Sequence, residues 1–314
     1  MAPAEHETVL RDEAVAALNV RAEGIYVDAT FGRGGHARKI LSQLGPNGRL
    51  LAIDRDPEAV AAAEREFSGE ARFAIVQRPF SMLGETIDER GWHKRVNGIL
   101  FDLGVSSPQL DESARGFSFL REGPLDMRMD PTRGESAAEW LQRASEQEIA
   151  DVLHELGEER YARRIARAIV RERALAPIAT TRRLAEIVAG AVPTRERSKD
   201  PATRTFQAIR LQVNRELDEL RAALPQALAA LAPGGRLVAI SFHSLEDRIV
   251  KQFLRKQERG EELPPDLPVR QTEIRPRLKV IGKPVRPGAE EVMRNPRARS
   301  AIMRVAEAPE AANV

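Results

Sequence analysis

The 314-residue sequence contains no cysteine, and aromatic residues make up only 4% of it. Without cysteine the chain has no disulfide, no thiolate metal ligand and no cysteine nucleophile. No apolar run approaches the length of a membrane span, and residues 1–7 lack the charged and then apolar pattern of a secretory signal. We therefore expect a cytoplasmic protein with no membrane partner.

The chain also lacks a strong excess of charge of either sign. Charged residues account for 31% of the sequence, but the formal net charge is only +2. Net charge is therefore a weak indicator of nucleic-acid binding, which has to be judged instead from local clusters of basic residues. The apolar share of 42% is ordinary for a folded protein. The length suggests about two domains, or one large domain with an insertion.

What the sequence does contain is a pattern typical of a nucleotide-cofactor cleft. An apolar run at residues 25–29 includes Asp28, a glycine-rich turn follows at 32–35, and a second apolar run ends at Asp54. The glycines allow a tight turn against a ligand, and an acid about 20 residues later suits ribose hydroxyls. The segment also fits the Gly-x-Gly-x-x-Ala form of the dinucleotide fingerprint, so context has to identify the cofactor.

Asp28 stands where the first predicted strand meets the glycine turn, and it favours a cofactor without phosphates. A diphosphate beside this turn would bring like charges together, at a cost of roughly 4 kcal/mol per pair at about 4 Å near a protein surface. S-adenosylmethionine has an adenosine for Asp54, no phosphate, and an ammonium and a sulfonium that a carboxylate favours. The sequence therefore predicts S-adenosylmethionine as the cofactor.

Short apolar runs closed by turn-forming residues alternate with helical patterns at both ends of the chain. In the first part, strands are predicted at residues 25–29, 50–54, 71–76 and 98–102, and a helix at 57–67. In the last part, the pattern predicts a helix ending near Leu231, a turn at 232–235, and strands at 236–241 and 301–305. This alternation predicts an α/β fold with a doubly wound, mostly parallel sheet.

Between these parts, helical periodicity without strands predicts an inserted α-helical domain. The capping-box spacing of Ser145 and Glu148 should open a helix through Leu156. Apolar residues at helical spacing follow at 161–170, 184–188 and 206–217. The predicted domains are residues 1–110 together with 216–314, and the insertion 111–215. A surface loop is expected at 258–287, which is rich in proline and charge, and fraying at 306–314.

The order of these features resembles the class I, Rossmann-like methyltransferase sheet, whose ligands bind at the carboxyl ends of the strands. The acids that end strands and the Leu-x-Pro-Gly-Gly-x-Leu run at 231–237 carry this resemblance. Four longer strings are similar to those of the ribosomal RNA small subunit methyltransferase H family, the MraW-like methyltransferases; they lie at residues 102–110, 123–130, 241–248 and 295–300. The similarity extends from about Thr8 to Arg304.

This resemblance implies a function and a set of site residues. Family members use S-adenosylmethionine to methylate N4 of a cytidine in the decoding region of 16S rRNA, in the small ribosomal subunit. Carried over by position, the implied cofactor-binding residues are Gly34, Gly35, His36, Asp54, Phe80, Asp102 and Gln109. Phe80 follows the third strand, where an aromatic ring can pack on adenine, whereas Gln109 rests on the resemblance alone. No metal-ligand spacing appears, and methyl transfer from a sulfonium needs no metal.

Asp102 is also the candidate catalytic residue. A cytosine amine is a poor nucleophile because its lone pair is delocalised, so a carboxylate that accepts its hydrogen bonds can help to align it, and positioning contributes roughly 7–11 kcal/mol. Many amine-directed methyltransferases end this strand with Asp/Asn-Pro-Pro-aromatic, whereas this chain has Asp-Leu-Gly-Val-Ser-Ser-Pro. The roles of Ser106 and Ser107 therefore stay open, and Asp102 can contact the cofactor, the amine or both. His243 can face the substrate or have a purely structural role.

Arginine-rich segments are the candidate RNA contacts, because arginine matches phosphate geometry with two donors. They occupy residues 160–173, 194–199 together with Arg204 and Arg210, and 294–299. Next to 160–173, the acids Glu158, Glu159 and Glu172 favour a solvated, ion-paired face. Few acids interrupt 294–299, which is therefore the favoured RNA contact. The expected substrate is a nucleotide flipped out of folded rRNA, because the target base must leave its stack.

Two other functions stay open at this point. A nucleotide-dependent oxidoreductase would use the same sheet and glycine fingerprint, but Asp28 and the Pro-Gly-Gly turn oppose it. A non-catalytic ribosome-assembly factor would use the cleft only to sense a ligand. The favoured interpretation is an S-adenosylmethionine-dependent rRNA (cytosine-N4) methyltransferase whose helical insertion helps to hold the ribosomal substrate.

Overall fold

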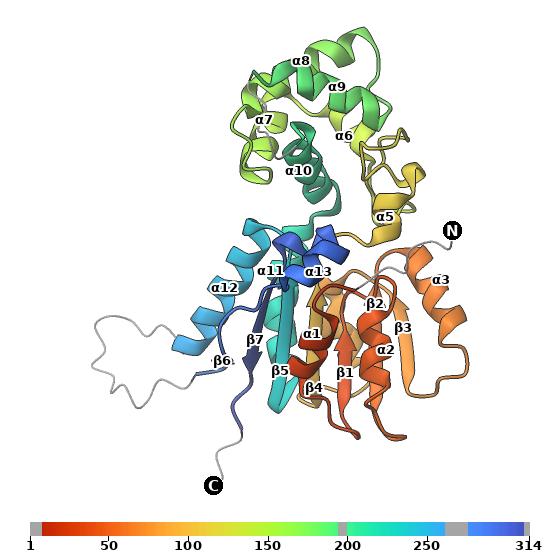
Figure 1. Ribbon diagram of the computed structural model, residues 1–314, viewed down its shortest axis with the longest axis vertical. Coiled ribbons are helices and arrows are strands. Elements are labelled where there is room, and N and C mark those ends of the chain that lie inside the picture. The colour runs from red at the N-terminus through yellow and green to blue at the C-terminus, as the bar shows by residue number, and fades with distance from the viewer. Residues whose placement is uncertain (1–7, 194–199, 261–275, 311–314) are drawn as a thin grey trace, which may run out of the picture. The chain divides into compact units, whose positions relative to one another are not determined.

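The computed structural model describes residues 8–193, 200–260 and 276–310, which fold into two compact units (Figure 1). The first unit combines the chain before Val105 with the chain after Glu216, and the second is Val105–Glu216. Each unit has buried hydrophobic clusters of its own. Within the described residues, no helix is both long and apolar enough to span a membrane.

The first unit is built on a seven-stranded sheet with the order β3-β2-β1-β4-β5-β7-β6. Its strands are β1 (Ile25–Asp28), β2 (Arg49–Asp54), β3 (Phe73–Gln77), β4 (Val96–Asp102), β5 (Leu231–Ser241), β6 (Lys279–Val280) and β7 (Ile302–Glu307). The first five strands pair in parallel, and β7 runs antiparallel to both β5 and β6. The predicted doubly wound, mostly parallel sheet is confirmed.

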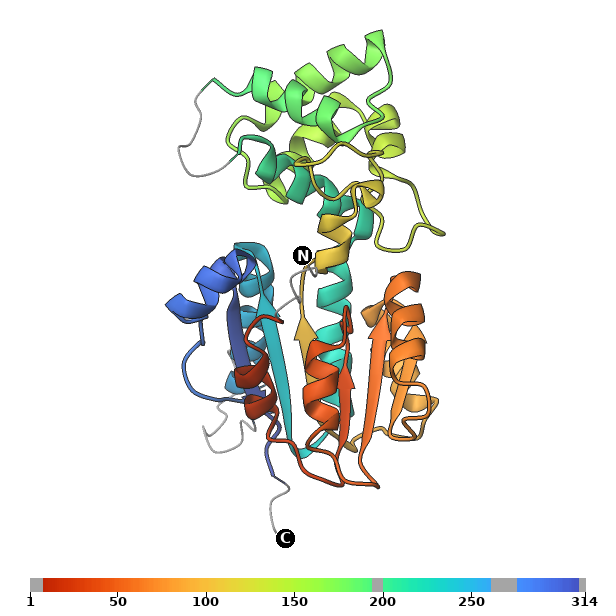
Figure 2. The same ribbon diagram turned by 45° about the vertical axis from the view of Figure 1, so that its right-hand side comes forward.

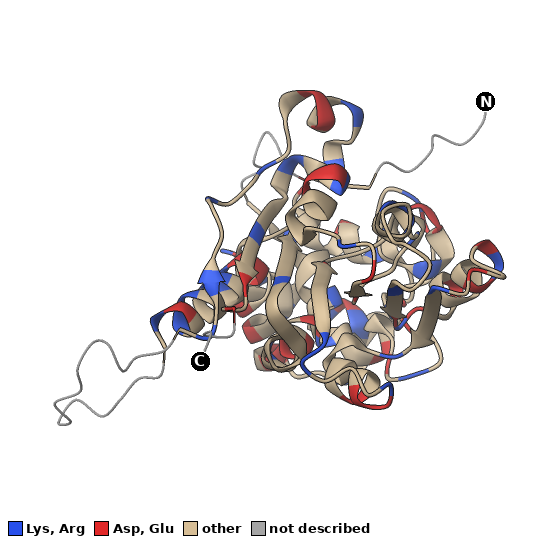
Figure 3. Ribbon diagram, turned by 90° about the horizontal axis from the view of Figure 1, so that it is seen from below, with Lys and Arg blue, Asp and Glu red and all other residues tan. Residues whose placement is uncertain are grey.

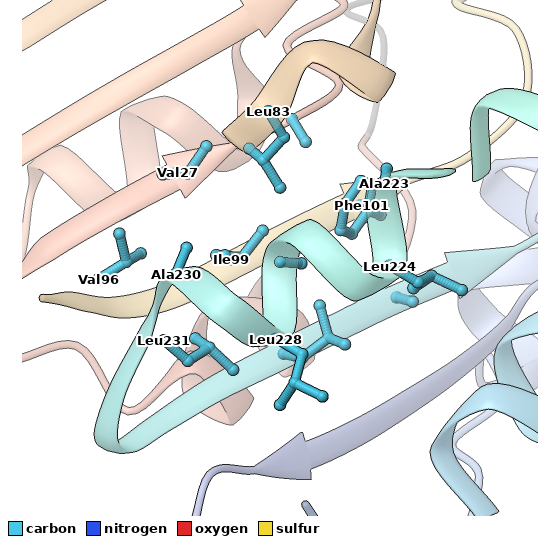
Figure 4. Packing of buried hydrophobic residues seen from close by; sticks show 14 of the residues in the cluster. Val27, Leu83, Val96, Ile99, Phe101, Ala223, Leu224, Leu228, Ala230 and Leu231 are labelled. Carbon is cyan, nitrogen blue, oxygen red and sulfur yellow. The ribbon is translucent and has the colours of Figure 1, made fainter. Parts of the chain in front are cut away.

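Helices cover both faces of this sheet, which explains why its strands are nearly continuous apolar runs (Figure 2). One face packs on α1 (Arg11–Leu18), α2 (Gly35–Leu41) and α3 (Pro57–Glu66). The other packs on α4 (Leu83–Asp88), α11 (Glu216–Ala230) and α12 (Ser244–Arg259). Successive side chains of β4 point to opposite faces of the sheet: Ile99 and Phe101 belong to the hydrophobic cluster on one face, and Leu100 belongs to the cluster on the other. Figure 4 shows Leu224 and Leu228 of α11 on the side of the sheet that carries Ile99 and Phe101.

The structure corrects three predictions for the last part of the chain. β5 begins at Leu231, before the predicted turn at 232–235, so this turn lies inside the strand. There the pairing of β5 with β4 shifts in register, from Val96↔Leu231 to Gly98↔Arg236. Two of the residues predicted to be a loop form β6, which pairs with β7 through the backbone and leaves no periodic signal in the sequence. β7 extends to Glu307, into the segment expected to fray. Residues 261–275 and 311–314 lie outside the described residues.

Four short elements complete the first unit and the connection to the second. They are η1 (Phe80–Met82), α13 (Ala289–Arg294), η4 (Pro296–Ser300) and, after Val105, α5 (Ser107–Asp111). A partly buried side-chain contact anchors α13, since the carboxylate of Glu291 accepts through Oε1 from the amide of Leu10 at 2.7 Å. Neither α13 nor η4 was predicted, because both are too short for a periodic signal.

The second unit is helical in the residues that the structure describes. After α5 it contains η2 (Ser113–Arg115), α6 (Ala137–Arg143), α7 (Glu146–Glu155), α8 (Ala162–Leu175), α9 (Thr181–Ala191) and α10 (Ala202–Asn214). The capping box at the start of α7 is confirmed, with the amide of Ser145 donating to Glu148 Oε2 at 2.7 Å. One boundary was wrong: Leu217 belongs to α11, because Arg215 has a φ of 52° and ends α10.

Candidate functional site

The candidate site lies in the first unit, at the carboxyl ends of β1 and β4. In the sheet, β2 and β3 lie on one side of β1, whereas β4, β5, β7 and β6 lie on its other side. The strand order therefore reverses between β1 and β4. Ligands of open α/β sheets bind at such a switch point. The backbone ties the two strand ends together, since the amide of Ala29 donates to the carbonyl of Leu100 at 2.9 Å and the amide of Asp102 donates to Thr30 Oγ1 at 2.6 Å.

Asp28, at the end of β1, is a buried carboxylate that is only partly satisfied. It is 1% exposed. Its Oδ1 accepts from the amide of Thr30 at 3.2 Å, and its Oδ2 has no hydrogen-bond partner. Burial raises the pKa of Asp28 to about 7; the charge of Asp54 adds to this effect, and the Thr30 amide opposes it. No arginine or lysine of the described chain forms an ion pair with it.

Asp54, at the end of β2, holds the glycine turn in place. Its Oδ2 accepts from the amide of Gly32 at 2.8 Å and its Oδ1 from the amide of Asp56 at 2.9 Å. Burial raises the pKa of Asp54 to about 6, although both amides oppose that shift. Each carboxylate oxygen has two lone pairs, so both can still accept from a ligand hydroxyl.

Asp102, at the end of β4, is more accessible than Asp28. Its side chain is 23% exposed, and its buried Oδ1 has no hydrogen-bond partner. Burial raises the pKa of Asp102 well above its ordinary value, and the charges of Asp28 and Glu246 add to this shift. Three carboxylates therefore gather at the strand ends, and among the described side chains none with a permanent positive charge pairs with Asp28 or Asp102.

His36, in the first turn of α2, faces this cluster as a neutral side chain. Its Nδ1 lies 3.7 Å from Asp102 Oδ2, which is too long for a hydrogen bond. Burial lowers the pKa of His36 to about 4, so the ring is uncharged at neutral pH and forms no ion pair with Asp102. Its buried Nε2 has no partner. His36 can therefore donate or accept a hydrogen bond, but it does not neutralise the acids.

The glycines of the turn are required by the fold itself. Gly34, the residue before α2, has a φ of 71°, and a Cβ there would lie 2.7 Å from Phe31 Cζ. A Cβ at Gly35 would lie 1.7 Å from Thr8 Oγ1. The sequence interpretation assigned both glycines to close approach of the cofactor. In the structure, backbone conformation and the packing of Phe31 and Thr8 already exclude a side chain at either position.

Two further predicted cofactor residues also have structural roles. Phe80, in η1 after β3, is partly buried and packs edge to face on Phe101 with ring centroids 5.8 Å apart. Gln109 is buried in the second unit, in α5, where its Oε1 accepts from the amide of Ser106 at 2.9 Å and completes a capping box. Ser106 is thus the residue that caps α5, and Ser107 is buried in its first turn.

The structure also places His243 and identifies Glu246, a site residue that sequence reasoning missed. His243 caps α12, with its Nδ1 accepting from the amide of Glu246 at 3.4 Å, and Glu246 Oε2 accepts from the amide of Phe242 at 2.8 Å. This geometry favours the structural role for His243. Glu246 is 2% exposed, and its charge acts on Asp102. The spacing of a capping box was present, but histidine is not among the usual N-cap residues.

The predicted arginines differ in their surroundings, since Arg210 of α10 is 15% exposed and binds Glu216 at 2.8 Å. Arg294, Arg297 and Arg299 lie exposed on α13 and η4, around the buried Ala298. In α8, the predicted pairing is confirmed for Glu172, which binds Arg171 at 2.9 Å. Glu159 was wrongly expected to pair with arginine; it is buried and accepts from the amide of Tyr161 at 2.8 Å. Residues 194–199 lie outside the described residues.

Charges of both signs are mixed over the helices in the view of Figure 3. Local groups of arginines therefore have to be judged by their own geometry, as the near-zero net charge already indicated.

Comparison with known proteins identifies relatives over almost the whole chain. The sequence pattern of the MraW methylase family matches residues 3–309. The chain is 61% identical over 303 residues to a ribosomal RNA small subunit methyltransferase H of Nitrosococcus oceani, which covers 96% of both proteins.

The solved structures that match this chain are more distant. A putative rRNA methylase from Clostridium thermocellum matches with 14% identity and a TM-score of 0.45, covering 97% of this chain and 99% of that one. A putative methyltransferase from Streptococcus mutans, solved in complex with SAH, matches with 11% identity and a TM-score of 0.43, covering 96% of this chain and 99% of that one.

Proposed function

Because the chain belongs to the MraW methylase family, we propose that it methylates the ribosomal RNA of the small subunit with S-adenosylmethionine as methyl donor. The proposed target is N4 of a cytidine in the decoding region of 16S rRNA, as the sequence resemblance implies. We further propose that the first unit binds the cofactor and that the helical second unit helps to hold the RNA. A cytoplasmic location follows from this substrate.

The buried acids at the switch point carry the cofactor proposal. Asp28 and Asp102 each have a buried oxygen without a partner, and their pKa values are raised because no cation compensates for burial. A cationic ligand would supply that compensation, whereas a diphosphate would add repulsion of roughly 4 kcal/mol per pair at about 4 Å. S-adenosylmethionine carries an ammonium and a sulfonium and no phosphate. The site therefore favours this cofactor over a dinucleotide.

The other proposed cofactor contacts follow from where the strands end. Asp54 would accept hydrogen bonds from the ribose hydroxyls, with the lone pairs that Gly32 and Asp56 leave open. Phe80 would pack on the adenine with the part of its ring that stays exposed. Gly34, Gly35 and His36 would border the cofactor from the turn. The proposed contact of Gln109 rests on the resemblance alone.

Asp102 is the proposed catalytic residue because it combines an unpartnered oxygen with partial exposure. Its carboxylate would accept a hydrogen bond from the exocyclic amine and align the nitrogen with the transferable methyl group. In the reaction a nitrogen–carbon bond forms, the sulfur–carbon bond breaks and leaves its electron pair on the sulfur, and the methylated nitrogen releases one proton to solvent water. The fully buried Asp28 is too enclosed to contact a nucleotide, so its proposed role is to favour the cationic cofactor.

Methylation of ribosomal material that lacks the modification tests this function. Small subunits and naked 16S rRNA from a strain without this protein would be incubated with the chain and S-adenosylmethionine, and the nucleosides analysed by mass spectrometry. We expect N4-methylcytidine in 16S rRNA, and comparison of the two substrates shows which form is used. Methylation at another atom would contradict the proposed target, and no incorporation would favour an assembly factor. Calorimetry with S-adenosylmethionine and NAD separates the methyltransferase from the oxidoreductase alternative.

A further inference from the structure

Helix α8 carries a row of arginines on its outer face. Ile165 and Ile169 are buried in the core of the second unit, whereas Arg164, Arg167 and Arg171 are exposed. These arginines follow one another at spacings of three and four residues, so they share one face of the helix over roughly 10 Å. From the sequence this helix is expected to be a solvated, ion-paired surface. The structure adds a cavity beside it.

A pocket of about 560 Å³ lies between α8 and α9. We name it the α8–α9 groove. Its charged lining consists of Arg164, Arg167, Arg171, Glu172, Arg183 and Glu186. Four positive and two negative side chains thus face the same space, and none of the lining residues is aromatic. The groove is a positively charged hollow in a chain whose net charge is close to zero.

The acids of the groove do not satisfy its arginines. Glu172 is shared, since its two oxygens bind Arg171 at 2.9 Å and Arg183 at 2.6 Å. Arg167 Nε is 3.6 Å from Glu146 Oε1, beyond hydrogen-bond distance, and its side chain is 78% exposed. Arg164 has no ion pair with any described residue. Because each guanidinium has five donors, most of the donors in the groove remain available to a ligand.

We propose that the α8–α9 groove binds the phosphate backbone of ribosomal RNA; this inference rests on the proposed function. The planar guanidinium group of an arginine can donate two parallel hydrogen bonds to the oxygens of one phosphate. Ion pairs near the surface, such as those of Glu172, are weak enough for phosphates to replace them. The lack of aromatic lining argues against stacked bases, so the contact would be independent of sequence. The groove would hold the RNA, while Asp102 in the first unit acts on the target base.

Gly190 allows a test that removes no arginine. This residue lines the groove in α9, and a Cβ there would have no atom within 4 Å. The backbone therefore accepts a Cβ at this position, and replacing glycine within a helix does not disfavour the helix. Gly190→Glu would place a negative charge in the groove, and Gly190→Gln is the matched neutral control. We expect Gly190→Glu to weaken binding of naked 16S rRNA by roughly 10-fold at low salt, and Gly190→Gln to bind within about 2-fold of wild type.

Removing arginines gives an independent measurement. The double variant Arg167→Gln with Arg171→Gln should lower the slope of log K against log salt by about 2, one for each lost phosphate contact. The control variant Arg133→Gln with Arg182→Gln removes two charges of similar exposure, 78% and 61%, from the same unit but outside the groove. We expect the control to keep the wild-type slope. Binding of S-adenosylmethionine, measured by calorimetry, should be unchanged in all four variants.

The outcomes separate this inference from the proposed function. If Gly190→Glu and Gly190→Gln bind 16S rRNA equally well, or if both double variants lose the same slope, the groove is not an RNA contact, even when the wild-type chain methylates rRNA. If the groove variants bind naked rRNA normally but bind assembled small subunits weakly, the partner is a ribosomal protein and the inference is wrong. A wild-type chain that neither binds nor methylates rRNA overturns both proposals.

Discussion

At the scale of single residues, the acids at the strand ends oppose folding and favour ligand binding at the same time. A carboxylate buried without a cation is destabilised in its charged form, which is why the pKa of Asp28 rises to about 7. The same uncompensated charge attracts a cation into the site. The role proposed for Asp28, to favour a cationic cofactor, therefore comes at the expense of the stability of the free protein.

Asp28→Asn should stabilise the free protein near and above neutral pH. The folded-state pKa of about 7 exceeds the ordinary value of 3.8, so between these pH values the folded state retains a proton that the unfolded state has lost. Stability therefore falls as pH rises through this window. Asparagine has no such charge, and we expect a gain of roughly 2–4 kcal/mol at pH 8 that shrinks towards pH 4. Thermal melts from pH 4 to 8 measure this difference.

The same variant should bind S-adenosylmethionine more weakly than wild type, by calorimetry at pH 8. Asp56→Asn is a suitable control for losing a nearby carboxylate, because Asp56 caps α3 through the amide of Glu58 and asparagine is an equally good cap. A variant at Asp28 that is neither stabilised nor impaired in binding would contradict the role proposed for this carboxylate.

Asp102→Asn and Asp102→Ala test the catalytic proposal. Asp102→Ala removes the hydrogen-bond acceptor for the amine and should lower single-turnover methyl transfer by roughly 100-fold or more. Asp102→Asn keeps an acceptor oxygen but loses the negative charge, so its loss should be smaller. If Asp102 acts mainly on the amine, calorimetry should show a much smaller change in cofactor affinity than in rate. Near-normal turnover of Asp102→Ala would remove this residue from both the cofactor and the substrate role.

At the scale of elements, side chains at or just after two strand ends hold neighbouring segments in place. Asp54 fastens the glycine turn to β2, and His243 and Glu246 form the cap of α12 directly after β5. The cap keeps Glu246 buried beside Asp102, so a helix terminus contributes to the electrostatics of the site. A change in this cap should therefore act first on stability.

His243 variants distinguish a helix cap from a catalytic group. His243→Ala should lower the free energy of unfolding by about 1 kcal/mol, whereas His243→Asn and His243→Ser supply an oxygen to the same amide and should restore most of it. Chemical denaturation measures the stability, and single-turnover methylation measures the chemistry. If the asparagine variant is stable but has lost methyl transfer, the imidazole has a role beyond the cap.

At the scale of the whole molecule, the two units have separate cores. The buried cluster from Phe117 to Ile209 lies entirely within the second unit, and the clusters on the two faces of the sheet lie in the first. The proposed cofactor contacts lie in the first unit, apart from Gln109 of α5, so the cofactor should stabilise the two units unequally.

Hydrogen exchange can detect this difference. With S-adenosylmethionine at about 100 times its Kd, the free energy of opening of the first unit should rise by roughly 2.7 kcal/mol, which slows exchange of its most protected amides by about 100-fold. We expect this slowing in β1 and β4 and little change in α8 and α9. Equal slowing in α8 and α9 would show that the two units open together.

The sequence by itself determined the sheet and the acids that end its strands. Residues such as Ile99, Leu100 and Phe101 are apolar on both faces because helices cover both, and this local composition predicts a parallel strand without any knowledge of its partners. Asp28, Asp54 and Asp102 were identified for the same reason, since a charged residue directly after such a run marks the end of a strand. Helices with caps and periodic apolar faces, such as α7, were predicted for equally local reasons.

Only the tertiary structure decided the features that depend on residues far apart in the chain. The two-residue strand β6 exists because β7 pairs with it, and Gly35 must be glycine because Thr8 packs against it. The pKa values of Asp28 and Asp102 depend on burial and on each other, and the groove beside α8 depends on how α9 packs. Such contacts leave no periodic or compositional trace, because each partner alone is compatible with many environments.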